Sequence, residues 1–328
     1  MHQRVRTYLR WHAWVVHHPR HTLARCLAFI FVASAIILLG LQLPAVQALT
    51  TPMPSSALTA TNIQESVGVD SCGAGTWTAS EADSLWNYAL PADGFEPRTI
   101  GGYVGGPTVS CNDVSSSWQS TVSAGLPGGW GVIPIFGGAL PPASCGGPSS
   151  GDPISTSNPT QQGINDGSTA VTDAKNAGFY NMVVDDVEFY NWSPNSTCQT
   201  IVDAYLNGWV YEVQKLGLIP GVYGSAGSSI IGLYYEAGVS GEHMPEFVWP
   251  ASSSESVWNI SGIPNGSWEY DQRDMQYGAG YSYNGMSFDP DCIDTYAQGG
   301  LAESVWDTGA SYDGGTSEGS SPSYDNFC

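Results

Sequence analysis

The sequence is short of positive charge. Lysine and arginine together number 9, against 30 aspartates and glutamates, and five of the nine basic residues lie within the first 48 positions. The chain after position 48 therefore has four basic residues against all thirty acids, a formal charge of −26. This balance argues against nucleic acid as a partner, because proteins bind nucleic acid by neutralising its phosphates with lysine and arginine.

Histidine and paired cysteines are also scarce. Of six histidines only His243 follows position 48, and no Cys-x-x-Cys pair occurs anywhere in the chain. Zinc sites and histidine-based catalytic triads need these residues as ligands or as the general base. We therefore expect no metal and no cofactor, and acid–base chemistry would fall to carboxylates.

The first 48 residues have the pattern of a targeting segment. They combine basic residues and no acid with a long apolar run that begins at Cys26, followed by Val46 and Ala48 at the small-residue positions of a signal-peptidase site. The pattern predicts a signal peptide and a secreted, extracellular protein. The apolar run is close to the ~18 residues from which a spanning helix becomes possible, so an uncleaved N-terminal anchor is the alternative. Only in that case would the protein contact a membrane.

Three regions of different composition follow. Residues 49–63 are rich in Thr, Ser and Pro and carry no charge, as is typical of a linker. Residues 64–300 hold nearly all of the regular apolar pattern, enough for one large, monomeric domain. Residues 301–328 form a Gly/Ser-rich tail.

An even number of cysteines remains after the targeting segment. An exported chain with such a set is expected to form disulfide bonds. The candidates are Cys72, Cys111, Cys145, Cys198, Cys292 and Cys328. Three bridges among six cysteines allow fifteen pairings. We favour Cys111 with Cys145, because they lie in consecutive predicted loops.

Apolar, β-branched runs alternate with helical patterns through the central region. The predicted strands are residues 66–70, 99–106, 130–138, 181–189, 219–225, 246–252, 274–278 and 285–289, and the clearest helices are 80–90, 164–178 and 198–217. Such alternation is typical of parallel βαβ units. Eight strands in this span predict a single (β/α)8 TIM-like barrel, which typically takes ~250 residues. A doubly wound sheet is the alternative, but no G-x-G-x-x-G follows the first strand.

Three acids fall within the stretch NMVVDDVEFY, residues 181–190. Alternate side chains of a strand share a face, so Asp186 and Glu188 point one way and Asp185 points the other. If the apolar face packs on the outer helices, the first two acids look into the barrel mouth, where barrel enzymes carry their active sites. Asp185 is then left outside the site, as a cap or as a partner for Lys215.

Other predicted strands also finish in acids, amides or aromatic groups. We expect a catalytic role for Asp70, Asp186, Glu188 and Asp289, and substrate binding by Tyr103, Tyr223, Trp249, Gln276 and Tyr277. Converging acids and flat aromatic faces suit a sugar. Glycoside hydrolysis needs one carboxyl that keeps its proton and a second group that stabilises the cationic sugar. Neighbouring negative charges raise one carboxyl pKa and so supply the protonated acid without a histidine.

The ordered set of motifs resembles two related families. The stretches from Gly68 to Cys72 and from Tyr103 to Gly106, the Asp-x-Glu of residues 186–188 and the final Asp289 are similar to the bacterial glycoside hydrolase-like family called domain of unknown function 1906. They also resemble the family 25 glycoside hydrolases, the lysozyme-type muramidases. The resemblance covers about residues 65–300.

This resemblance implies a TIM-like barrel enzyme that hydrolyses β-1,4 bonds of bacterial cell-wall peptidoglycan. Glu188 would be the general acid, with Asp186 assisting it. The glycine-rich GAGTW after Cys72 departs from the more polar loop of the muramidases. A non-catalytic glycan-binding or cell-envelope protein with a degenerate hydrolase barrel is therefore the alternative.

Overall fold

The structure is a computed structural model of the chain, and it describes residues 66–91, 94, 96–108, 110–124, 130–236, 242–255, 259–263, 268 and 272–295. The predicted signal peptide, the linker and the tail with Cys328 lie outside the described residues. The chain divides into two compact units, Met1–Ser55 and Ser56–Cys328, and every described residue belongs to the second. Among the described residues, no helix has both the length and the apolar character needed to cross a bilayer.

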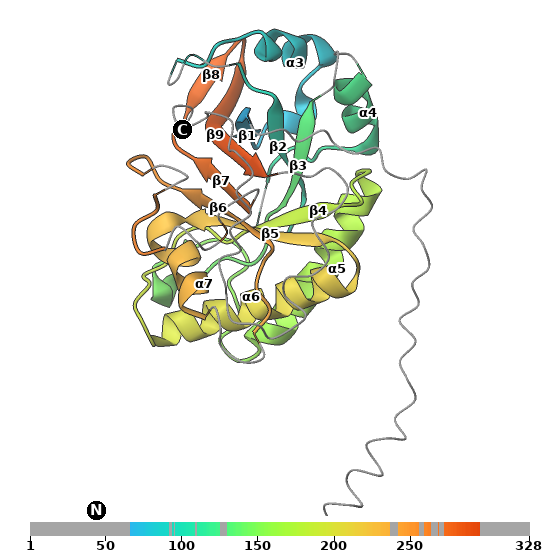
Figure 1. Ribbon diagram of the computed structural model, residues 1–328. Helices are drawn as coiled ribbons and strands as arrows, with labels where there is room; N and C mark the ends of the chain where they lie inside the picture. The colour runs from blue at the N-terminus through green and yellow to red at the C-terminus, as the bar shows by residue number, and fades with distance from the viewer. Residues whose placement is uncertain are drawn as a thin grey trace, which may run out of the picture. The chain divides into compact units, whose positions relative to one another are not determined.

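Eight strands of this unit close into a barrel (Figure 1). They are β1 (Ser66–Ser71), β2 (Thr99–Gly105), β3 (Gly131–Phe136), β4 (Met182–Asp186), β5 (Ile219–Ser225), β6 (Phe247–Ala251), β7 (Gln272–Gln276) and β9 (Met286–Thr295). Strands β1 to β7 pair in parallel in chain order, and β9 pairs with both β7 and β1. The predicted single TIM-like barrel is confirmed.

The last strand differs from the expected pattern, because β9 runs antiparallel to both of its neighbours. Only residues 277–285 separate β7 from β9, and the short strand β8 (Tyr281–Tyr283) uses part of them in a hairpin with β9. A parallel return needs a crossover of about a dozen residues or more, usually through a helix. The short connection therefore forces β9 to enter the barrel at the end where β7 finishes.

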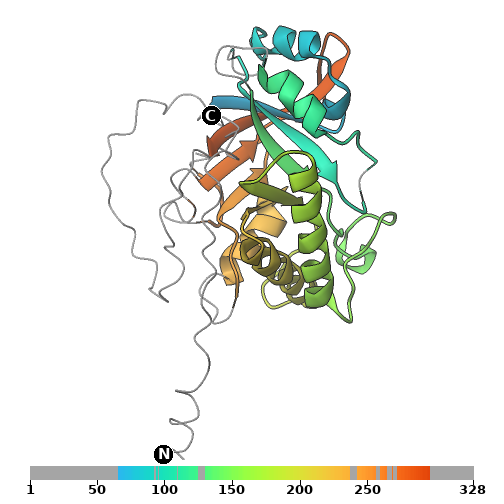
Figure 2. The same cartoon turned by 90° about the vertical axis from the view of Figure 1, so that its right-hand side faces the viewer.

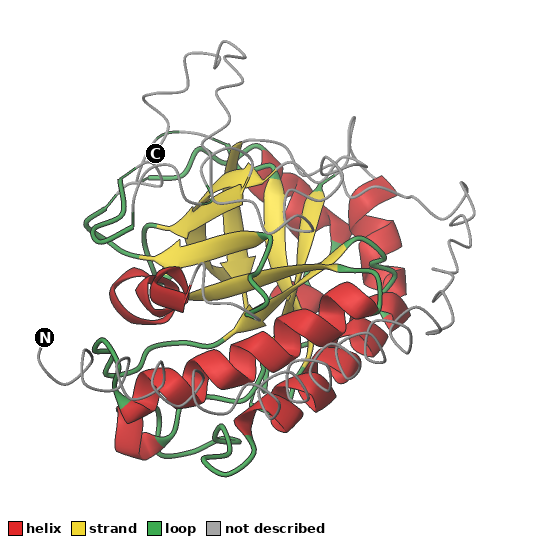
Figure 3. Ribbon diagram, turned by 60° about the horizontal axis from the view of Figure 1, so that its bottom comes forward, coloured by secondary structure: helices red, strands yellow, loops and turns green. Residues whose placement is uncertain are grey.

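On the outside of the barrel, a helix follows each strand from β1 to β5 (Figure 2). These helices are α3 (Ala79–Trp86), α4 (Ser116–Ala124), α5 (Pro159–Asn176), α6 (Thr197–Lys215) and α7 (Ile231–Glu236), with short helical turns η1 (Ala74–Thr76), η2 (Ala143–Cys145) and η3 (Ala226–Ile230). The long helices α5 and α6 lie side by side (Figure 3). A Cβ on Gly167 would lie 2.9 Å from the carbonyl oxygen of Trp209, so this close packing depends on glycine.

Alternation along the strands fills the barrel with apolar side chains. The interior cluster consists of Ile133, Ile135, Met182, Val184, Phe247, Trp249 and Ile293. Gly101 makes room for the largest of them, since a Cβ there would lie 2.7 Å from Cη2 of Trp249. On β4, Met182 and Val184 point inward while Val183 belongs to an outer cluster with Trp209. The predicted alternation of β4 is confirmed, and it turns Asp186 toward the mouth.

The disulfide bonds differ from the favoured pairing. Cys72 is bonded to Cys111 and Cys145 to Cys198, so the prediction that Cys111 pairs with Cys145 is wrong. Each loop of a barrel lies between two other loops. The order of the loops along the chain therefore does not show which of the two neighbours a cysteine is bonded to. Cys111 follows β2 and meets the loop after β1, with 4.6 Å between the two Cα atoms. Cys292 is disulfide-bonded as well.

Candidate active site

Four acids meet at one end of the barrel, and we call Asp70, Asp186, Glu188 and Asp289 the mouth cluster. Asp70 and Asp186 lie at the carboxyl ends of β1 and β4, and Glu188 follows β4 by two residues. Asp289 is paired in register with Asp70, near the start of the antiparallel β9. The negative charges of Glu188 and Asp289 both act on Asp70, and those of Glu188 and Asp70 act on Asp186. The four acids predicted from the sequence are thus brought together.

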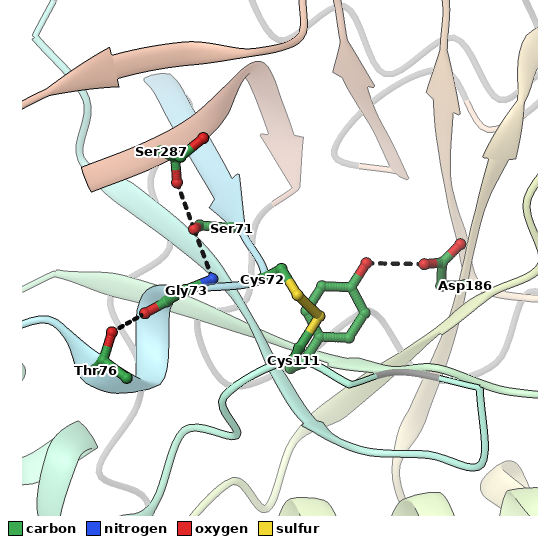
Figure 4. The surroundings of a disulfide bond; sticks show 8 residues. Ser71, Cys72, Gly73, Thr76, Cys111, Asp186 and Ser287 are labelled. Carbon is green, nitrogen blue, oxygen red and sulfur yellow. Dashed lines mark hydrogen bonds between the residues drawn. A yellow bond between two sulfur atoms is a disulfide. The ribbon is translucent and has the colours of Figure 1, made fainter. Parts of the chain in front are cut away.

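Asp186 is more deeply buried than Glu188. It is 5% exposed, and the hydroxyl of Tyr103 donates a hydrogen bond of 2.8 Å to its Oδ2 (Figure 4). Burial, followed by the negative charge of Glu188, raises the pKa of Asp186 to about 8, although the Tyr103 hydrogen bond opposes the rise. Asp186 therefore holds its proton at neutral pH.

Glu188 lies beyond the end of the strand rather than within it. Strand β4 ends at Asp186, and Glu188 has a φ of 59°, in the left-handed region that a residue other than glycine seldom adopts. The hydroxyl of Ser229 donates a hydrogen bond to the Glu188 carbonyl oxygen and holds this turn. The Glu188 side chain is exposed, while partial desolvation raises the pKa of its carboxyl.

The predicted strand of residues 181–189 is therefore too long at its carboxyl end. Phe189, expected on the face that packs against the helices, is 50% exposed. The turn at Glu188 breaks the alternation before Phe189 is reached. A backbone strained in this way costs about 1–3 kcal/mol and is often found at functional sites.

An amide side chain joins the other two acids of the mouth cluster. Nε2 of Gln276 donates to Oδ2 of Asp70 at 2.9 Å and to Oδ2 of Asp289 at 3.3 Å. Its Oε1 accepts a 2.8 Å hydrogen bond from the hydroxyl of Tyr223. Burial, and then the charge of Asp289, raises the pKa of Asp70 to about 7, against the opposing effect of the Gln276 hydrogen bond. Asp70 thus changes its protonation near neutral pH.

A further acid beneath the mouth was missed from the sequence. Asp291 is fully buried, and Nε1 of Trp249 donates to its Oδ1 at 3.1 Å. Burial and the charge of Asp70 raise the pKa of Asp291 well above its usual range. The signal was present in the sequence, because Asp289 and Asp291 stand two positions apart on one strand and so share a face.

The predicted substrate-binding residues are divided between the mouth and other places. Tyr103, Tyr223 and Gln276 contact or approach the mouth cluster, as described above. Trp249 is fully buried in the barrel interior, and its ring lies edge-on to Tyr223 at 5.8 Å between centroids. Tyr277 is half-buried and packs against the outer cluster that contains Val222 and Val248.

A pocket of about 350 Å³ opens beside the mouth cluster. Its lining comes from the segment after β1 and from the β8–β9 hairpin: Asp70, Ser71, Cys72, Gly73, Thr76, Trp77, Glu81, Gly285, Met286, Ser287, Phe288 and Asp289. The hydroxyl of Ser71 donates a 2.6 Å hydrogen bond to the Ser287 carbonyl oxygen and joins the two sides (Figure 4). The Cys72–Cys111 disulfide fixes the first of these segments to the loop after β2. A hydrogen bond and a disulfide thus hold the walls of this pocket in place beside the acids.

In the part of the chain that the structure describes, no group of three or more His, Cys, Asp or Glu side chains has a geometry that could hold a metal ion. Asp185 points away from the mouth, as the alternation predicts, and is fully buried. Lys215 is not its partner, because its Nζ pairs with Oε2 of Glu212 at 2.8 Å. Asp185 is therefore a buried acid without a basic partner at Lys215.

A closed TIM-like barrel with this acid cluster at its mouth places the protein in the glycoside hydrolase-like class of barrel. Residues 90–293 match the family described as Rv2525c-like, glycoside hydrolase-like domain. The match covers more than half of the chain, so the chain belongs to this family.

Several solved structures resemble the chain at low sequence identity. An uncharacterised protein of B. stearothermophilus is 17% identical, with a TM-score of 0.44 over 70% of this chain and 96% of that one. The catalytic domain of endolysin ply40 from bacteriophage P40 of Listeria monocytogenes is 12% identical, with a TM-score of 0.42 over 70% and 93%. The spore cortex lytic enzyme SleM of Clostridium perfringens is 13% identical, with a TM-score of 0.43 over 70% and 67%. No curated protein sequence matches the chain.

Proposed function

We propose that the protein is an exported glycoside hydrolase that cleaves β-1,4 bonds of cell-wall glycan, with peptidoglycan as substrate. The observation that carries this proposal is the mouth cluster itself, in which an exposed Glu188 lies near Asp186, whose carboxyl keeps its proton at neutral pH, and near Asp70, whose protonation changes there. Family membership supports the reaction class. The likeness of the sequence motifs to those of the muramidases supports the substrate.

Glu188 is the proposed general acid, because it is exposed whereas Asp186, at the end of β4, is buried. It would give its proton to the glycosidic oxygen as the bond to the sugar breaks. The resulting Glu188 carboxylate then lies close to Asp186, which still holds a proton and can stabilise the new charge by donating a hydrogen bond.

Asp70 and Asp289 would act on the sugar. The transition state of glycoside hydrolysis resembles an oxocarbenium ion, and negative charge near it lowers the barrier. Gln276 holds both carboxyls in place, so little reorganisation is needed when positive charge develops. The adjoining pocket offers room for a sugar ring or a substituent next to these two acids.

The test is digestion of purified peptidoglycan, followed by turbidity and by mass analysis of the released fragments. The wild-type protein should clear the suspension and release fragments with new reducing ends, and Glu188→Gln should not. Thermal unfolding and circular dichroism of both proteins show whether the variant is folded. Absence of clearing by the wild type between about pH 4 and about pH 8, on walls of several compositions, would refute the hydrolase.

The second candidate is a non-catalytic protein that binds cell-wall glycan. It is favoured by the burial of Asp70 and Asp186, which are only 8% and 5% exposed, because substrate then reaches Glu188 and Asp289 more readily than the other two acids. This alternative predicts saturable sedimentation of the protein with walls that Glu188→Gln leaves unchanged. Failure of the protein to sediment with any wall preparation would contradict it.

A further inference from the structure

A second group of acids lies directly behind the mouth, on the outer side of β4. Asp185 is 0% exposed and packs next to Gly138 and the hydroxyl of Tyr205. That hydroxyl accepts a 3.1 Å hydrogen bond from the Ala139 amide and donates one of 3.1 Å to Oδ2 of Asp166. The contacts join β4, the loop after β3, α5 and α6 at one point. We call Asp166, Asp185 and Tyr205 the back cluster.

The back cluster lies where the backbone pairing of β4 is weakest. Strand β4 pairs with β5 along its whole length, from Met182 to Asp186. Its register with β3 covers only two pairs, of which Phe136 with Asp185 is the last. The side chain of Asp185 continues the connection beyond this pair, because it reaches Gly138, two residues further along the β3 chain.

The contact at Gly138 leaves no room for a side chain. A Cβ on Gly138 would overlap the Asp185 carboxyl and would lie 2.5 Å from the Tyr205 hydroxyl oxygen. The adjacent Ala139 is itself held by Tyr205. The loop after β3 and the end of β4 are therefore fitted together by three side chains and a glycine.

The groups that face Asp185 keep it neutral. Burial, and then the negative charges of Asp166 on α5 and Asp186 on β4, raise the pKa of Asp185 well above its usual range. The nearby Tyr205 hydroxyl on α6 and the Gly138 amide oppose this rise through their polarity. A protonated carboxyl can act as both donor and acceptor in such a site, and it places no extra charge behind Asp186.

We propose that Asp185, Tyr205 and Gly138 form a lock that fixes the carboxyl end of β4 and thereby positions Asp186 and Glu188 in the mouth. The positioning role rests on the proposed hydrolase, whereas the lock itself concerns only the local stability of β4. Asp185 and Tyr205 are positioning residues on this view, since they lie behind the barrel wall and do not touch the substrate.

The sharpest test is Gly138→Ala, with Gly227→Ala as the matched control. The first substitution forces a methyl group into the lock, whereas nothing lies within 4 Å of the Cβ position at Gly227. We expect Gly138→Ala to remain folded but to exchange the backbone amides of residues 186–190 faster than the wild type. With a soluble glycan fragment its kcat should fall by about 10- to 100-fold with little change in KM, because misplacement of a catalytic group acts mainly on the chemical step.

The second test separates a neutral lock from an ionic one. Asp185→Asn keeps one donor and one acceptor, so its amide exchange rates and kcat should stay close to those of the wild type. Asp185→Leu should exchange the same amides faster and have a lower kcat. Unchanged exchange in Gly138→Ala and Asp185→Leu would overturn the lock. Equal loss in Asp185→Asn and Asp185→Leu would overturn the neutral form proposed here. Since exchange is measured without substrate, an inactive wild type would refute the hydrolase and leave this test intact.

Discussion

Asp185 and Asp186 are neighbours in sequence and lie on opposite sides of the barrel wall. Both are buried, and burial is the first cause of the raised pKa of each. They differ in what surrounds them: Asp186 has the exposed Glu188 beside it in the mouth, whereas Asp185 is enclosed by α5, α6 and the loop after β3. A raised carboxyl pKa therefore does not identify a catalytic acid by itself, and access to a ligand has to be considered with it.

The largest expected difference between the two sides is catalytic. Glu188→Gln should lower the rate of reducing-end release from peptidoglycan by about 10²- to 10⁴-fold, the usual contribution of a general acid. Asp185→Asn, on the other side of the wall, should stay within about threefold of wild type, since its neutral amide keeps the lock. Equal losses in the two variants would show that the distinction between mouth and back is mistaken.

Removing the two described disulfides separately should compare a loop that lines the pocket with loops that do not line it. Serine at Cys72 and Cys111, or at Cys145 and Cys198, should each lower the free energy of unfolding by about 2–4 kcal/mol, as measured by urea denaturation. Only the first pair borders the pocket, so only its loss should also weaken binding to walls. A weaker interaction in both double variants would point to a general loss of stability instead.

Stability should fall as pH rises from about 4 to about 8, because folded Asp70 and Asp186 hold protons that the unfolded chain has released. Their pKa values rise from 3.8 to about 7 and about 8, so the folded state binds more protons than the unfolded state across this interval. Each such proton contributes a slope of at most about 1.4 kcal/mol per pH unit. Urea denaturation at several pH values should show the fall, and Asp186→Asn should make it shallower. A stability that increases over this interval would contradict the assigned protonation.

The smallest effects should come from removing one tyrosine hydroxyl, either that of Tyr103 at the mouth cluster or that of Tyr205 in the back cluster. Tyr103→Phe removes a hydrogen bond that lowers the pKa of Asp186, so this pKa should rise further and the alkaline limb of the activity profile should move to higher pH by a fraction of a unit. Tyr205→Phe should leave that limb in place and lower the unfolding free energy by about 0.5–1.5 kcal/mol. If the alkaline limb shifted in Tyr205→Phe and not in Tyr103→Phe, the roles assigned to the two tyrosines would be wrong.

The barrel is predictable from the sequence because its signals are local and repeated. Each strand from β1 to β6 is a short, largely apolar run, and alternation along β4 is enough to place Asp185 and Asp186 on opposite faces. The direction of β9 was not predicted, because it follows from the shortness of one connection and not from the composition of the strand. Helix α4 and strand β8 were also missed; both are short, and their sequences lack a strong apolar period.

The site is predictable in part. The four acids were found because each lies at or near the end of a predicted strand. The left-handed turn at Glu188 was not, since residues 186–190 contain no glycine that would indicate it. The disulfide pairing and the partners of Asp185 depend on which outer segments contact one another. Local patterns in a single sequence do not specify such contacts.

Closure by β9 has a consequence for the order in which the protein becomes functional. Of the eight barrel strands it is the last to leave the ribosome, and it seals the exposed edges of both β1 and β7. It also carries Asp289, so a chain that has not yet added β9 lacks both a closed barrel and one acid of the mouth cluster. Assembly of the fold and assembly of the site are thus completed in one step, when the last strand joins the barrel.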